Sequence, residues 1–185
     1  MSSPIVEPSR AIEYFKEALA YQFQADRLYE CIDSQTLKKL PLRDPIYFLY
    51  HHAAELALVA CLLSHNFRVR RGTHSIGGLF EQCRKKHLLG TVDEHHEIQG
   101  LMVFLDGRDY GQRYRYAGQD DFRPDLPWVQ EIVGKLIAAV EPHVETWANA
   151  HGIAGPSEPY SATKLWHFFG KPFITEQSIP LKPGP

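Results

Sequence analysis

The sequence predicts an all-α protein, an up-and-down bundle of about five helices. Apolar residues recur at intervals of three and four in several long segments, which is the spacing of one face of a helix. No segment of any length shows the alternation of a half-buried strand. One segment, residues 45–67, is apolar on all of its helical faces, and such a helix belongs in the middle of a bundle.

Length and composition fit one globular domain. The chain has 185 residues, 44% of them hydrophobic and 23% charged, which suffices for a sizeable core. Its net charge of −2 argues against a generally basic nucleic-acid-binding surface, so binding of that kind has to rest on a local patch. Neither a signal-peptide core nor an apolar run of about 18 residues is found, so we expect a cytoplasmic protein without a membrane partner. The cysteines are expected to be buried free thiols: Cys31, Cys61 and Cys83.

The first two helices follow from their apolar stripes and their capping residues. Ser9 is the expected N-cap of a helix that runs to about Asp33. Asp44, followed by proline, is the expected N-cap of the helix apolar on all faces, which we expect to end near Phe67. Residues 1–8 are expected to be a short polar lead.

Three further helices are expected. Thr73 or Ser75 caps the third, which ends before Gly90 and buries Ile76, Leu79, Phe80 and Cys83. Asp93 caps the fourth, which ends near residue 107 and carries Ile98, Leu101, Met102 and Leu105. Pro127 opens the fifth, and Pro142 is expected to kink it because proline removes an internal hydrogen bond.

The last part of the chain differs in composition. Residues 153–185 contain many prolines together with aromatic residues, so we expect an irregular extension that packs on the bundle or on a partner chain. The domain organisation predicted is therefore a helical bundle over residues 1–152 and an extension over 153–185.

Glu55 is the one formally charged residue in the central helix, and it is the first candidate ligand-binding residue. His51 and His52 precede it by four and three residues, so both side chains can reach its carboxylate. A buried carboxylate needs a partner or takes up a proton. Two readings stay open: a satisfied polar network in the core or at a subunit interface, and a ligand site.

Two segments concentrate positive charge beside or between helices. The first follows the central helix and the second lies in residues 106–127, where arginines alternate with tyrosines. Guanidinium groups bind phosphates and aromatic rings stack on bases, so both segments are candidates for nucleotide binding. For the second segment, the alternative is a loop with packed tyrosines and solvated arginines. The candidates are Arg68, Arg70, Arg71 and His74 in the first, and Tyr110, Arg113 and Arg115 in the second.

No metal or cofactor is expected from the sequence. The chain has ten histidines and the run Glu94-His95-His96-Glu97, but no Glu-x-x-His pair of the kind that builds a di-metal bundle site. Adjacent histidines point about 100° apart on a helix, so that run is expected to be a solvated first turn. A cysteine nucleophile is not expected either, because each cysteine lies on an apolar face.

The middle of the chain resembles the HEPN domain, the nucleotide-binding helical domain of prokaryotes and higher eukaryotes. His51-His52-Ala53-Ala54-Glu55-Leu56-Ala57-Leu58 resembles the His-x-Ala-Ala-Glu-x-Ala-Leu run of that family. Thr73-His74-Ser75-Ile76 resembles the Thr-His-Asp-Leu start of its next helix, with Ser75 in place of the usual Asp. Arg113-Tyr114 or Arg115-Tyr116, after Tyr110, resembles its Tyr…Arg-Tyr segment.

The resemblance implies a homodimer that binds a nucleotide or RNA and that accompanies a minimal nucleotidyltransferase, as in toxin-antitoxin pairs. Many members of the family are metal-independent ribonucleases, and the corresponding catalytic candidates here are Arg68 and His74. Val69 stands where the ribonuclease motif has a polar residue, and Val59 stands where many members have a lysine. The favoured function is therefore nucleotide or RNA binding without catalysis. The alternatives are a ribonuclease of the toxin type and a non-catalytic protein-interaction module.

Overall fold

The structure is a computed structural model that describes residues 5–6, 8–31, 43–70, 75–89, 92–105 and 124–153. In these ranges the chain forms five α-helices: α1 (Ala11–Cys31), α3 (Arg43–Ser64), α4 (Ile76–Lys85), α5 (Val92–Leu105) and α7 (Leu126–Ala150). The predicted all-α bundle is confirmed. The predicted extension lies outside the described residues apart from residue 153.

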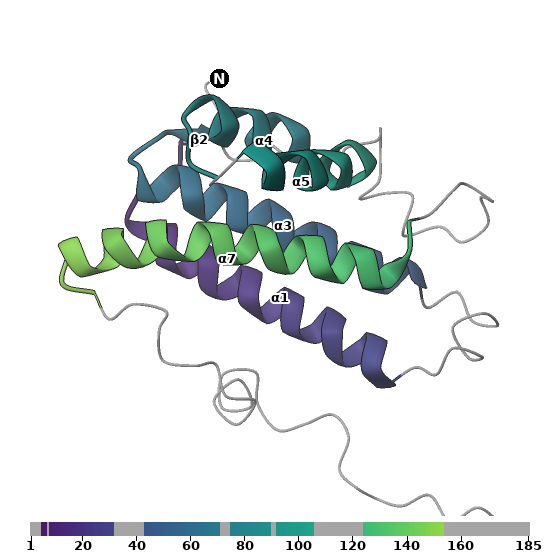
Figure 1. Cartoon of the computed structure of the whole chain (residues 1–185). Coiled ribbons are helices and arrows are strands. Elements are labelled where there is room, and N and C mark those ends of the chain that lie inside the picture. The colour runs from purple at the N-terminus through teal and green to yellow at the C-terminus, as the bar shows by residue number, and fades with distance from the viewer. Residues whose placement is uncertain are drawn as a thin grey trace, which may run out of the picture.

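Helix α3 is the centre of the bundle (Figure 1). It packs against α1 and α7 on one side and against α4 on the other, while α5 joins α4 to α7. Every residue from Ala53 to Ser64 is buried. The burial of one large aliphatic side chain contributes about 1.5–3 kcal/mol, so this helix supplies much of the core.

The apolar character of α3 also makes it the one helix in the described ranges that is long and apolar enough to cross a membrane. That stretch runs from Pro45 to Ser64 and has a mean hydropathy of 1.5. Because 78% of it is buried inside the bundle, packing against the other helices already accounts for its composition.

The start of the chain is more ordered than the sequence predicts. Ile5–Val6 form strand β1, which pairs antiparallel with β2, Val69–Arg70. Pro8–Arg10 then form a 3-10 helix that leads directly into α1, so Ser9 is not the N-cap of α1 as predicted. The side chain of Val69 is buried in the core, and the pairing with β1 holds it there.

The starts of the helices agree only in part with the predicted caps. Ser75 is the N-cap of α4, and its Oγ accepts a hydrogen bond of 3.0 Å from the N–H of Gly78. Asp44 and Asp93 were predicted to be caps, but both lie inside the first turns of α3 and α5. Both helices therefore start two residues earlier than predicted.

Three helices end in the same hydrogen-bond pattern, the Schellman motif. A residue with positive φ follows the last turn, and the next residue donates its N–H to a carbonyl five residues earlier. These residues are Asn66 after α3 (φ 59°), His87 after α4 (φ 57°) and Gly152 after α7 (φ 67°). Helix α4 ends at Lys85, before Gly90 as predicted, and the residue with positive φ that follows it is His87.

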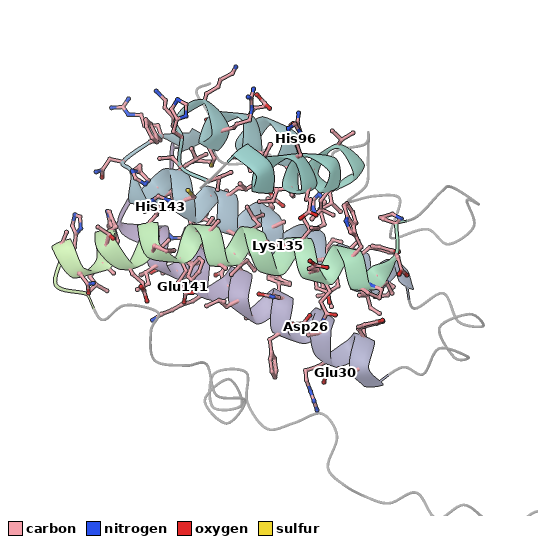
Figure 2. The ribbon with its side chains drawn as sticks, viewed as in Figure 1. Asp26, Glu30, His96, Lys135, Glu141 and His143 are labelled. Atoms are coloured by element: carbon pink, nitrogen blue, oxygen red, sulfur yellow. The ribbon has the colours of Figure 1, made fainter. Side chains whose placement is uncertain are left out.

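Helix α7 is continuous from Leu126 to Ala150 and contains Pro142. The helix begins at Leu126, one residue before Pro127, which was predicted to open it. The large apolar side chains of α7 are buried except Trp128, which is half-buried against the core. Lys135 ties α7 to α5, with its Nζ 2.7 Å from Glu97 Oε2 and 2.9 Å from Glu131 Oε1 (Figure 2).

Candidate functional site

A cluster of three polar side chains lies in the third and fourth turns of α3. It consists of His51, His52 and Glu55, and one nitrogen or oxygen from each side chain lies within 4.8 Å of the other two. His52 Nδ1 is 3.3 Å from Glu55 Oε2. The predicted approach of histidine to the Glu55 carboxylate is therefore confirmed for His52, and His51 lies in the same cluster.

Burial of the cluster is uneven. His51 and Glu55 are both 7% exposed, whereas the side chain of His52 is 32% exposed. His52 therefore lies between the buried carboxylate and solvent. A ligand that approaches Glu55 from solvent would meet His52 first.

Two aromatic rings hold the His52 imidazole. The ring of Tyr21, on α1, meets it edge-on at a centroid distance of 4.8 Å. The ring of Phe48, one turn earlier on α3, stacks on it at 5.3 Å with 22° between the planes. These contacts restrict the orientation of His52, so its Nδ1 is directed toward Glu55 before any ligand binds.

Phe48 and Tyr21 were not predicted to belong to the site. Phe48 precedes His52 by four residues, so helical spacing alone would have placed the two rings together. Tyr21 lies on another helix, and no short-range pattern connects it with His52. Its place in the site depends on how α1 packs on α3.

Arg68 lies apart from the histidine-glutamate cluster. At a rise of about 1.5 Å per residue, the helix from Glu55 to Ser64 spans about 14 Å, and Arg68 follows the turn beyond it. Arg68 is exposed, and Arg70 is the second residue of β2. The helix from Glu55 to Ser64 therefore lies between the cluster and Arg68 along the chain.

The remaining predicted site residues lie outside the described residues: Arg71, His74, Tyr110, Arg113 and Arg115. Two positions at which the sequence differs from the HEPN pattern are described by the structure. Val69 and Val59 are both 6% exposed and belong to the hydrophobic core. A polar side chain or a lysine at either position would have to be buried in the same place.

The other sequence candidates behave as expected on the residues described. Cys61 and Cys83 are free and buried. Contact with Cys61, together with burial, raises the pKa of the Cys83 thiol, which disfavours the nucleophilic thiolate. His96 and Glu97 are exposed on α5, and Glu97 is paired with Lys135.

A second pair of histidines joins the end of α3 to α7. His65 Nε2 lies 3.0 Å from His143 Nδ1, so one ring donates and the other accepts (Figure 2). Partial burial and the neighbouring His143 lower the pKa of His65. The pair can share one proton, but two protonated rings at this distance repel each other.

The His65–His143 pair should make the fold less stable in acid. Because the folded-state pKa of His65 lies below its unfolded value, the folded chain binds fewer protons, and stability falls as the pH drops below about 6.5. We expect the Tm to fall from pH 7.5 to pH 5.5, and to fall less in His65→Gln. The exposed His96→Gln is the control and should keep the wild-type pH dependence. Equal pH dependence in all three proteins would contradict the prediction.

No family model, curated protein or solved structure matches the chain. The function therefore has to be inferred from the residues described above.

Proposed function

We propose that this protein binds a nucleotide or RNA at the cluster of His51, His52 and Glu55. The observation that carries the proposal is a buried carboxylate on an otherwise apolar helix, reached from solvent past an oriented histidine. A buried carboxylate is costly unless it is paired, and one partner beside Glu55 is the partly exposed His52.

The chemistry of the cluster suits a nucleobase or a ribose. A carboxylate accepts hydrogen bonds from amino groups of bases and from ribose hydroxyls, and histidine nitrogens both donate and accept. The aromatic surroundings of His52, formed by Tyr21 and Phe48, offer rings on which a base can stack.

In this proposal Arg68 contacts a phosphate of the ligand. It lies beyond the end of α3, more than about 14 Å from Glu55 along the chain of the helix. An extended ligand such as a nucleotide or a short RNA carries its base and its phosphates at separate places, so one such ligand could contact both the cluster and Arg68. The resemblance to HEPN domains adds Arg71, His74, Tyr110, Arg113 and Arg115 as further contacts in this proposal.

The same resemblance carries the assembly we propose, a homodimer that works beside a minimal nucleotidyltransferase. Light scattering of the purified chain should then give twice the mass of one chain. The mass of a single chain at micromolar concentration would remove the dimer from the proposal, without bearing on ligand binding.

The binding proposal is tested with the full chain in EDTA, titrated with nucleoside mono- and triphosphates and with short single-stranded RNA. We expect at least one of these to raise the Tm by several degrees. Glu55→Gln keeps the size of the side chain but removes its charge, and should weaken that ligand by about 10–100-fold, as expected for a lost hydrogen bond to a charged group. His96→Ala removes an exposed side chain on α5, and this variant should bind the ligand as the wild type does.

Two results would overturn the binding proposal. One is the absence of any shift with all of the ligands. The other is a shift that Glu55→Gln leaves unchanged, since the ligand would then bind elsewhere on the chain.

A further inference from the structure

We propose that His51, His52 and Glu55 also form a binding site for one divalent transition-metal ion, with zinc as the best match. This inference goes beyond nucleotide or RNA binding, because it concerns the chain without any such ligand. It rests on the placement of three metal-ligating side chains on one helix.

The separations are close to those that a metal requires. In a tetrahedral zinc site with bonds of about 2.0–2.2 Å, the ligand atoms lie about 3.3–3.6 Å apart. His52 Nδ1 and Glu55 Oε2 are 3.3 Å apart, so this pair already has the required spacing. All three ligand atoms lie within 4.8 Å of one another, so closure around an ion needs shifts of about 1 Å in side chains, not in the helix.

Helical geometry explains why adjacent histidines can serve here. His51 and His52 point about 100° apart, but Glu55 lies one turn later, between them, at i+4 from one and i+3 from the other. The carboxylate is therefore the shared neighbour of both rings. In the run Glu94-His95-His96-Glu97, by contrast, Glu97 is paired with Lys135.

The set of ligand atoms indicates the class of metal. Two imidazole nitrogens with one carboxylate oxygen are typical of zinc and of other first-row transition metals. Calcium and magnesium prefer sites built from oxygen, and this cluster supplies one carboxylate only. Three protein ligands leave a coordination position for water or for an exogenous ligand.

The exposure of the cluster suits an ion that enters from solvent. The Glu55 side chain is 10% exposed and that of His52 is 32% exposed, which leaves a route for a metal ion from solvent. Tyr21 and Phe48 hold the His52 ring in place, so little ordering of that side chain remains to be done on binding.

The test uses the full chain after removal of metals, without nucleotide. Titration with Co²⁺ followed by visible absorption, and with Zn²⁺ by calorimetry, should show one equivalent bound with a dissociation constant of micromolar or below. His52→Ala and Glu55→Gln should each raise the dissociation constant for Zn²⁺ by at least about tenfold. Glu55 is buried, so its substitution can also destabilise the fold. His52→Gln is therefore the second variant, because the His52 side chain is partly exposed, and circular dichroism of the metal-free variant checks that it is folded.

Two control variants separate this site from other histidines. His96→Ala removes an exposed histidine on α5, and His65→Ala removes the other close histidine pair. Both should bind Zn²⁺ as the wild type does. The proposal is overturned if Zn²⁺ fails to bind below about 100 μM, if folded His52→Gln binds it unchanged, or if His65→Ala loses it. Nucleotide binding is measured in EDTA, so either proposal can fail without the other.

Discussion

Replacement of Asp26 by alanine is expected to lower the free energy of unfolding by about 2–4 kcal/mol. Asp26 Oδ1, on α1, accepts hydrogen bonds from the Tyr50 hydroxyl at 2.7 Å and from Gln130 Nε2 at 2.9 Å. These donors lie on α3 and α7, so one carboxylate joins the three helices that pack together (Figure 2).

The expected loss is large because Tyr50 is buried. Its relative exposure is 0%, and burial, together with the hydrogen bond to Asp26, raises the pKa of its hydroxyl, so the proton stays available for donation. Without Asp26 the hydroxyl loses the acceptor that the structure gives it, and a buried donor without an acceptor is more costly than the deletion of both partners.

Chemical denaturation of three variants checks this prediction. Tyr50→Phe removes one donor and leaves Asp26 bonded to Gln130, so it should cost only about 1 kcal/mol. Glu30→Ala, one turn further on α1, breaks an exposed ion pair with Arg27 and should change stability by less than about 1 kcal/mol. A loss in Asp26→Ala no larger than that in Glu30→Ala would show that the three-helix contact contributes little.

This contact also marks the limit of what the sequence predicts. Helix periodicity identified α3 as central, and it named all four buried residues of α4. Asp26, Tyr50 and Gln130 come from three helices and are up to 104 residues apart, so no local pattern joins them. The pairing of β1 with β2 was missed too, because two residues per strand are too few to show alternation.

In the candidate site, too, contacts within one helix could be predicted and contacts with other segments could not. His51, His52 and Glu55 lie within one turn or so of a single helix, so their spacing predicted their contact. Arg68 was predicted from the positive charge that follows the helix, and it lies beyond the end of α3, so no helical spacing joins it to the cluster. Asn66 and His87 show a further limit, because both adopt positive φ at helix ends where glycine is the usual signal.

Pro142→Ala is expected to stabilise the fold by about 1–3 kcal/mol. Proline inside a helix has no N–H to donate and its ring crowds the preceding turn, yet α7 is helical on both sides of Pro142. Pro142 itself is exposed, so alanine removes no buried contact and restores a donor to the carbonyl of Ala138, four residues earlier.

Part of this gain would come from helix propensity alone, so the comparison variant is Asn149→Ala, an exposed position in the last turn of the same helix. It should gain about 0.5 kcal/mol or less. In urea denaturation the free energy of unfolding should therefore rise clearly more in Pro142→Ala than in Asn149→Ala. A gain no larger than that of Asn149→Ala, or a loss, would mean that α7 needs the geometry that proline imposes. Since His143 is the next residue and contacts His65, the pH dependence of Pro142→Ala would then show whether proline serves to place that histidine.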